Sequence, residues 1–286
     1  MSKKNILVTG ANGQLGMEFR DLERRFPSYI FLFVSKDELA INDVDSVKQY
    51  FGDRTIHYCI NCAAYTAVDK AESEKELALA INATAVGILA AVCKKHGTQL
   101  FHFSTDYVFN GQSGIPYWET DPTDPVNFYG QTKLEGEHAA TLNDPTSIII
   151  RTSWVYSRHG KNFVKTMIRL LNEKDHISVV ADQLGSPTHA ADLAAAAMQI
   201  IISENYIPGI YHYSNEGIIS WYQFASAIKE IIGSDCIVNA IQTTNYPTPA
   251  ARPKYSAFNT SRIRQTYALE LKDWRKSLET CIAAMK

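Results

Sequence analysis

The chain opens with the sequence Asn5-Ile-Leu-Val-Thr-Gly-Ala-Asn-Gly-Gln-Leu-Gly16, in which three glycines follow an apolar run. The run is typical of a buried strand, and residues 17–26 have the amphipathic pattern of a helix. In a turn between the two, Gly10 allows a tight bend, Gly13 lets the backbone approach a pyrophosphate and Gly16 lets the helix pack on the strand. A loop that needs glycine only for its shape is the alternative. The strand and helix on either side favour a phosphate site at the helix N-terminus.

Apolar runs of strand length alternate with amphipathic helical segments along most of the chain. This alternation predicts an α/β fold, a doubly wound parallel sheet of the Rossmann type with helices on both faces. We expect an NAD(P)-binding domain of residues 1–152 and about 189–214, and a smaller substrate-binding region of residues 153–188 and 215–286. The predicted strands are 5–9, 29–34, 57–63, 100–103, 147–152 and 208–213. The predicted helices are 17–26, 44–51, 75–96, 162–171, 190–202 and 220–232, with short helices after residue 261.

The composition is that of an ordinary globular protein. Of the 286 residues 45% are hydrophobic and 20% are charged, and the formal net charge is -2. A net charge this small provides no field to recruit nucleic acid or an anionic membrane. No apolar run reaches the length of a membrane span and no signal peptide precedes the first strand, so we expect a cytoplasmic protein.

The spacing Cys59-x-x-Cys62 could suggest a redox pair or half of a zinc site, whereas the eight histidines show no ligand spacing. Cys59 and Cys62 lie within the predicted strand 57–63, where residues three apart point to opposite faces. No second pair follows at metal spacing. We therefore expect five reduced cysteines, mostly in the core, and assign no metal ligand.

Tyr129 and Lys133 form a Tyr-x-x-x-Lys pair in the segment 127–133. On a helix these residues share one face, so the ammonium would favour the phenolate and lower the pKa of Tyr129. Alone, the spacing is more often a solvated helix face. Thr105 changes this interpretation, because it follows the predicted strand 100–103 at the edge where parallel sheets bind ligands. The three side chains predict a site that holds and protonates a carbonyl group.

Two further segments are candidate cofactor contacts. An acidic residue at the end of the second strand binds the ribose of NAD, but this chain has Ser35 and Lys36 there, which could accept a 2′-phosphate. NADPH is therefore favoured and NADH is possible, since Lys36 could equally be an exposed lysine. The residues after strand 57–63 would let a cofactor lie against the backbone: Ala63, Ala64, Tyr65 and Thr66.

Three other side chains each allow two interpretations. Trp154, just past a strand end, could stack on a sugar or belong to the core. Arg252, in a proline-punctuated loop, could clamp a pyrophosphate or be an exposed loop arginine. Asn82 is a poor helix former inside the helix 75–96, and either makes hydrogen bonds or faces solvent.

Six motifs occur in order over nearly the whole chain and together resemble the dTDP-4-dehydrorhamnose reductase family, in the extended branch of the short-chain dehydrogenase/reductase superfamily. The resemblance implies reduction of the C4 ketone of dTDP-4-dehydro-L-rhamnose by NAD(P)H, giving dTDP-L-rhamnose for bacterial surface polysaccharide. The motifs are Thr9–Gly16, Asn61–Glu72, Ser104–Phe109, Tyr129–Lys133, Arg151–Tyr156 and Tyr246–Pro253.

The resemblance also implies residue roles. Tyr129 would donate the proton, and Lys133 would hold the nicotinamide ribose and tune Tyr129. The sugar nucleotide would meet Thr105, Asp106, Tyr129, Trp154 and Arg252. The cofactor would meet Gly10, Gly13, Gln14, Leu15, Gly16, Ala64, Tyr65, Thr66 and Phe103.

The chain departs from the family pattern at two positions. Ala40 stands where the family often has aspartate, so the adenine contact would come from the backbone or from Ile41. Tyr65 stands where some relatives have histidine. Mg²⁺ and a homodimer are implied by the resemblance alone, because no acidic cluster in the sequence assigns metal ligands.

Other functions fit parts of the same pattern. A reductase or epimerase of another nucleotide-ketosugar would use the same scaffold, and an epimerase would regenerate its cofactor rather than consume it. Relatives of this fold also serve as the non-catalytic regulatory partner of methionine adenosyltransferase. The intact Thr105, Tyr129 and Lys133 argue against that role.

Overall fold

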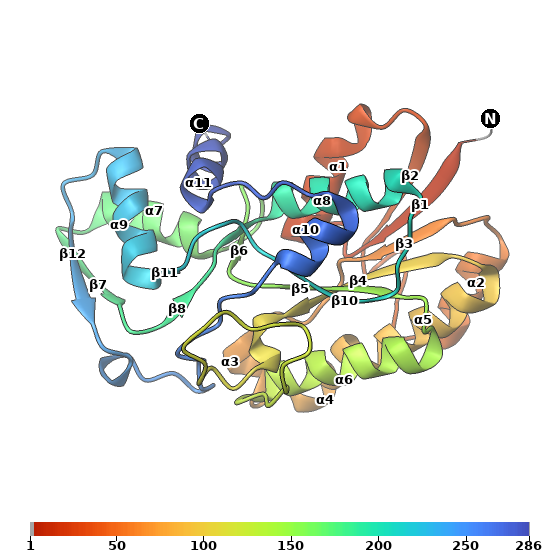
Figure 1. Cartoon of the computed structure of the whole chain (residues 1–286), viewed down its shortest axis with the longest axis horizontal. Coiled ribbons are helices and arrows are strands. Elements are labelled where there is room, and N and C mark those ends of the chain that lie inside the picture. The colour runs from red at the N-terminus through yellow and green to blue at the C-terminus, as the bar shows by residue number, and fades with distance from the viewer. Residues whose placement is uncertain (1–2, 286) are drawn as a thin grey trace.

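The computed structural model describes residues 3–285 and is built on a six-stranded sheet of order β10-β5-β4-β3-β1-β2 (Figure 1). All of its strand pairs are parallel. Because β2 and β3 lie on either side of β1, the strand order reverses there, and ligands of such sheets bind at the carboxyl ends beside this point. The predicted doubly wound sheet is confirmed. The strands are β1 (Lys4–Thr9), β2 (Tyr29–Val34), β3 (Tyr58–Asn61), β4 (Gln99–Thr105), β5 (Ile148–Thr152) and β10 (Gly209–Tyr213).

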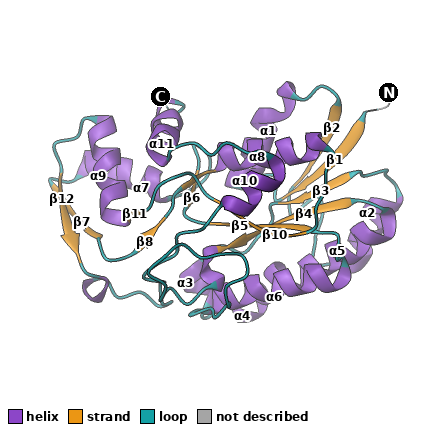
Figure 2. Cartoon of the chain, viewed as in Figure 1, coloured by secondary structure: helices purple, strands orange, loops and turns teal. Residues whose placement is uncertain are grey.

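Helices cover both faces of this sheet (Figures 1 and 2). One face carries α1 (Gln14–Leu22), α8 (Ala190–Ser203) and α10 (Ser261–Tyr267), and the other carries α2 (Val44–Gly52), α5 (Ala85–His96) and α6 (Phe128–Asn143). Alternate strand residues enter two separate apolar clusters, so that Ile6 and Val8 face one cluster and Leu7 faces the other. Burial on both faces explains why the strands are continuous apolar runs.

A smaller lobe lies beyond the carboxyl ends of the sheet strands, at the left of Figure 1. It has its own apolar cluster, formed mainly by α7 (Phe163–Glu173), α9 (Trp221–Ile232) and α11 (Trp274–Ala283). Its parallel pair β7 (His176–Val180) and β12 (Ile237–Ile241) was not predicted, because polar residues interrupt both short strands and half of their residues are exposed. The chain enters this lobe after β5 and again after β10. The short elements are η1 (Glu23–Arg25), α3 (Val68–Ala71), η3 (Asp106–Val108), β6 (Val155–Tyr156), β8 (Leu184–Gly185), β9 (Thr188–His189), β11 (Ile219–Ser220) and η4 (Thr243–Asn245).

Two predicted helices differ from the structure. Helix α1 begins at Gln14 rather than residue 17, because Gly13 adopts an extended conformation and serves as its N-cap. The predicted helix 75–96 is divided into α4 (Lys75–Leu79), a π-helical turn η2 (Ala80–Thr84) and α5. By length and composition the run Lys75–His96 could cross a membrane. However, 56% of its most apolar 18-residue stretch is buried inside the structure, as in a core helix.

Candidate active site

The glycine turn is packed too closely for other residues at two of its three positions. Gly10 has a φ of +64°, and a Cβ on it would lie 2.6 Å from the backbone nitrogen of Ala63. A Cβ on Gly16 would lie 2.5 Å from the carbonyl oxygen of Gly10. Gly13 caps α1 without any side-chain hydrogen bond, so the first N–H groups of the helix are available to an anion. This is the geometry that the sequence predicted for a pyrophosphate site.

The residues next to these glycines tie the turn to the rest of the fold. Gln14 accepts a hydrogen bond from Asn162 Nδ2 at 2.8 Å, which links the turn to the start of α7. Leu15 packs against the apolar cluster under α1 and α8. Both side chains therefore support the turn. Their backbone N–H groups belong to the N-terminus of α1 and are the groups that an anion would contact.

The end of β2 contains a carboxylate that the sequence interpretation overlooked. The backbone N–H of Ser35 donates to Glu38 Oε2 at 2.8 Å, and this bond holds the pKa of Glu38 below its usual value. Glu38 thus lies beside Ser35 and Lys36, the residues predicted for the 2′ end of the ribose. Ile41 is 6% exposed and belongs to the apolar cluster under α2 and α5, so its side chain serves the core.

Asn82 fixes the segment that follows β3. Its Oδ1 accepts from Tyr65 N at 2.9 Å, and its Nδ2 donates to Tyr65 O at 3.0 Å and to Thr132 Oγ1 at 3.1 Å. The side chain is 1% exposed, which decides between the two interpretations of Asn82 in favour of hydrogen bonding. The π-helical turn brings Asn82 to this loop, as such turns often do at functional sites.

Tyr129 and Lys133 lie on the first turns of α6, whose N-cap is Asn127. Burial raises the pKa of Tyr129 to about 12 and lowers the pKa of Lys133 to about 8. The Thr105 hydroxyl opposes the rise at Tyr129, and Lys133 is not among the groups that shift this pKa. The Lys133 side chain donates to the carbonyl oxygen of Phe103 at 2.7 Å. The expectation that the pKa of Tyr129 is lowered is therefore wrong for this structure, in which burial raises it.

Asp106 lies beside Thr105 in an almost fully buried position. Thr105 Oγ1 donates to Asp106 Oδ1 at 3.0 Å, while Asp106 Oδ2 has no hydrogen-bond partner among residues 3–285. Burial raises the pKa of Asp106 to about 6, although hydroxyl groups of Ser256 and Thr105 oppose the rise. A buried carboxyl oxygen without a partner is unusual and is available to a hydroxyl group of a ligand.

A row of polar side chains that the sequence interpretation missed crosses the sheet behind Lys133. Thr9, Asn61 and His102 are direct neighbours in β1, β3 and β4, and each is no more than 1% exposed. Their hydrogen bonds lead from Thr9 to His102, whose Nε2 lies 3.5 Å from Lys133 Nζ. The signal in the sequence was polar residues inside strands that are otherwise apolar.

A cavity of about 610 Å³ lies between the two lobes. Arg252 is on its wall, and its guanidinium donates to Asp69 Oδ2 at 2.9 Å and to Ala250 O at 2.8 Å. Trp154 has a φ of +48° and stacks on Trp221, with ring centroids 3.5 Å apart. Trp221 lines the cavity and was not predicted. Other lining residues are Tyr107, Met167, His176 and Thr248.

The acidic groups near this site do not fit Mg²⁺. Glu18, Asp21 and His159 form the one group with metal-ligand geometry within residues 3–285. However, Asp21 pairs with Arg158 at 2.7 Å, so a cation already occupies its carboxylate. Magnesium requires free oxygen ligands in a regular arrangement. We therefore assign no step to a metal.

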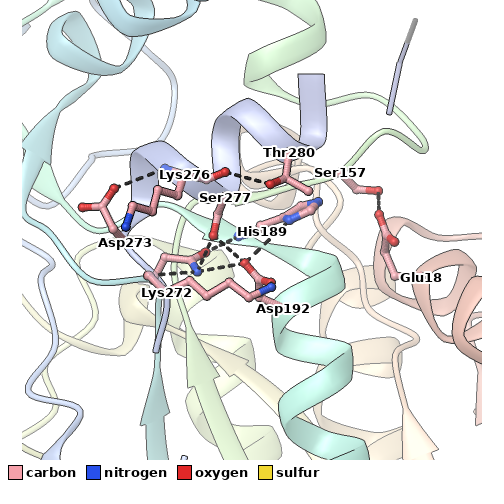
Figure 3. A network of polar contacts seen from close by, with 10 residues as sticks. Glu18, Ser157, His189, Asp192, Lys272, Asp273, Lys276, Ser277 and Thr280 are labelled. Carbon is pink, nitrogen blue, oxygen red and sulfur yellow. Dashed lines mark hydrogen bonds and ion pairs between the residues drawn. The ribbon is translucent and has the colours of Figure 1, made fainter. Parts of the chain in front are cut away.

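The neighbouring buried carboxylate, Asp192, is equally occupied, as Figure 3 shows. Lys272 donates to its Oδ1 at 2.6 Å, and Ser277 and Asn215 donate to its Oδ2 at 2.6 and 3.0 Å. Nearby, Glu18 accepts a hydrogen bond from Ser157. The five cysteines are free, as predicted.

Comparison with known proteins places these features in a family. A family model described as "RmlD substrate binding domain" matches residues 4–286. A dTDP-4-dehydrorhamnose reductase of Aggregatibacter actinomycetemcomitans is 40% identical, with 96% of this chain and 97% of that protein covered. Spore coat polysaccharide biosynthesis protein SpsK of Bacillus subtilis is 41% identical, with 96% and 95% covered. The crystal structure of a dTDP-4-dehydrorhamnose reductase from Bacillus anthracis in complex with NADP is similar with a TM-score of 0.94, at 39% identity over 99% of both chains.

Proposed function

Since this chain belongs to the RmlD substrate binding domain family of dTDP-4-dehydrorhamnose reductases, we propose that its Thr105, Tyr129 and Lys133 catalyse reduction of the C4 ketone of dTDP-4-dehydro-L-rhamnose by NAD(P)H. The chain is an NAD(P)H-dependent oxidoreductase of dTDP-rhamnose biosynthesis. The observation that carries the residue assignment is the position of these three side chains. They lie at the carboxyl end of β4 and the start of α6, at the edge of the sheet where the glycine turn follows β1.

When bound, NADPH supplies the hydride for C4. Thr105 and Tyr129 hydrogen-bond the ketone oxygen, and Tyr129 gives its proton to the alkoxide that develops there. A phenol with a pKa of about 12 is fully protonated at neutral pH and can donate. The Lys133 ammonium holds the ribose of the cofactor.

The rest of the site assignment follows the geometry. The cofactor lies over Gly10, Gly13 and the α1 N-terminus, with Ser35 and Lys36 at the 2′-phosphate. The sugar lies against Asp106 and Trp154, and the diphosphate lies near Arg252, whose pairing with Asp69 then has to rearrange. Residues 153–188 and 215–286 supply most of the substrate region, and we place the reaction in the cytoplasm, where NADPH is kept reduced.

Tyr129→Phe tests the proton donor. The ring keeps its packing but loses the acid, so we expect kcat to fall by about 10²- to 10⁴-fold, with NADPH affinity nearly unchanged. The measurement is NADPH oxidation with dTDP-4-dehydro-L-rhamnose, compared with the dissociation constant for NADPH. Near-full turnover in the variant would remove Tyr129 from this role.

The same assay separates the alternatives. A reductase consumes NADPH in proportion to the product, whereas an epimerase regenerates its cofactor. If NADPH is oxidised with a different dTDP-ketosugar but not with dTDP-4-dehydro-L-rhamnose, the substrate assignment is wrong. If the chain binds NADPH but does not oxidise it with any ketosugar, a regulatory subunit is favoured.

We also propose a homodimer formed through the groove between α5 and α6. Small residues, among them Gly87, Ala91 and Ala139, line the groove, with Lys48 and Lys95 at one end and Glu135 nearer the other. A two-fold axis across the groove brings the basic end of one copy to the acidic end of the other. Sedimentation should show a dimer that Ala91→Glu converts to a monomer. A native monomer at micromolar concentration contradicts the proposal.

A further inference from the structure

The buried row Thr9-Asn61-His102 ends at Lys133, and the direction of its hydrogen bonds can be deduced from the donors at its start. The backbone N–H of Ala63 lies 3.3 Å from Asn61 Oδ1, and the Thr9 hydroxyl lies 2.7 Å from the same atom. An N–H group can only donate, so the atom that faces it must be the amide oxygen. The amide nitrogen of Asn61 therefore faces His102.

That orientation determines the tautomer of His102. Asn61 Nδ2 lies 3.1 Å from His102 Nδ1, so Nδ1 must accept a hydrogen bond and carries no proton. A neutral imidazole then has its proton on Nε2. Protonation of both nitrogens is disfavoured as well, because burial and the nearby Lys133 hold the pKa of His102 well below its usual value.

The Nε2–H group faces Lys133 Nζ at 3.5 Å. An ammonium group offers only donors, so Nε2–H and the ammonium meet as donor against donor. A neutral amine could accept from Nε2–H and still donate to Phe103 O at 2.7 Å. The arrangement thus favours the neutral amine over the ammonium.

Few charges near Lys133 oppose this effect. Glu137, one turn further along α6, raises the pKa of Lys133, but Arg151 of β5 pairs with Glu137 at 2.7 Å. Asp106 of η3 lies towards the ketone end of the site, next to Tyr129. On the η2 side the polar contact to α6 is the neutral Asn82.

We infer that Asn61 and His102 are positioning residues that hold Lys133 close to its ionisation point, by fixing a His102 tautomer that disfavours the ammonium. This inference deepens the proposed function, on which its kinetic part rests. Lys133 can then lose or gain its proton near neutral pH. The pH at which kcat/KM falls on the alkaline side should therefore depend on the Asn61 amide. Burial already lowers the pKa of Lys133 to about 8, and the orientation of His102 acts in the same direction.

Asn61→Asp reverses the arrangement. A carboxylate at this position accepts from Thr9, Ala63 and His102 Nδ1–H, so the proton of the imidazole moves to Nδ1 and Nε2 becomes an acceptor for the ammonium. Lysine is the stronger base of the two, so the remaining proton stays on Lys133. The alkaline fall of kcat/KM should move to higher pH by about one unit. At a pH well above the Lys133 pKa of both proteins, this shift corresponds to about tenfold more ammonium in the variant.

The double variant Asn61→Asp with His102→Leu separates the tautomer from the added charge. It keeps the carboxylate but has no imidazole to transmit the change, so we expect most of the shift to disappear. A double variant that retains the shift of Asn61→Asp overturns the inference, because charge alone then explains it. If Asn61→Asp does not fold, Asn61→Leu removes the amide donor without adding charge and should shift the limb in the same direction by a smaller amount.

A measurement without substrate keeps the inference independent of the proposed function. Two-bond ¹H–¹⁵N spectra of the full chain distinguish the two tautomers, and we expect Nε2–H for His102 in the native protein and Nδ1–H in Asn61→Asp. The pH titration of the Nε2 resonance also follows the ionisation of Lys133. A native Nδ1–H tautomer overturns the inference. Failure to reduce any ketosugar refutes the proposed function, and the spectra still decide this one.

Discussion

At the scale of single residues, the site keeps Asp106 in a state that costs stability. Its carboxyl is 1% exposed, one oxygen has no partner among the described residues, and its pKa is raised to about 6 from 3.8. The folded protein therefore binds this proton more tightly than the unfolded chain. Stability from this group is fully present below about pH 4 and is lost as the pH rises through 6. The proposed contact with the sugar gives this carboxyl a role that the fold itself does not require.

Asp106→Asn should stabilise the fold at pH 7.5 while it reduces activity. A shift of about two pH units corresponds to about 3 kcal/mol, which the neutral amide recovers above pH 6 and not at pH 4. Urea unfolding of both proteins at the two pH values measures this difference, and kcat/KM with the ketosugar measures the loss of function. Equal destabilisation at both pH values would show that ionisation of Asp106 does not affect stability, and greater destabilisation at pH 7.5 would show that the carboxylate has an ionic partner in the folded protein.

At the scale of elements, the sequence predicted what local pattern controls. The apolar runs gave the sheet strands, and the three glycines gave the turn at Gly10 and the helix after it. The local pattern does not indicate which residues distant in the chain will pair. The pair β7 and β12 joins residues some sixty positions apart, as in Ile177 and Val238, with little burial to mark it. His102 was missed for the same reason, since its neighbours Asn61 and Lys133 meet it only in the folded sheet.

The π-helical turn η2 makes a testable prediction at this scale. Asn82 makes three hydrogen bonds that hold the backbone of Tyr65 and the side chain of Thr132. Asn82→Ala should raise the dissociation constant for NADPH by about tenfold and lower stability by about 1–3 kcal/mol, because it frees the loop 63–66 and leaves buried groups unpaired. Asn143→Ala is the control, since Asn143 donates only to Ala139 within its own helix. Equal effects of the two changes on NADPH binding would contradict a role for Asn82 in shaping the loop.

At the scale of the whole molecule, the buried carboxylate of Asp192 is one of the groups that join the two lobes. Asp192 lies on α8 over the sheet, while Lys272 and Ser277 lie in the C-terminal segment and Asn215 lies where the chain leaves β10. Burial raises the pKa of Asp192, but the nearby His189 ring and the hydrogen bonds from Lys272, Ser277 and Asn215 outweigh burial and hold the pKa well below its usual value. Stability from a carboxylate of this kind is present above the unfolded pKa and is lost as the pH falls through the folded one.

Asp192→Asn should therefore destabilise both lobes together. We expect a loss of about 3 kcal/mol at pH 7, because the charged partner is removed and the remaining donors lose an ionic acceptor. Lys272→Met should cost only about 0.5–1 kcal/mol, because the Lys272 side chain is 65% exposed and its charge is screened by solvent. The difference between the native protein and Asp192→Asn in urea unfolding should shrink as the pH falls below 4. EDTA should change neither the melting temperature nor the rate of NADPH oxidation, because Asp192 is already paired with Lys272 and Asp21 with Arg158. A melting temperature that falls with EDTA would show that a metal ion binds the folded protein.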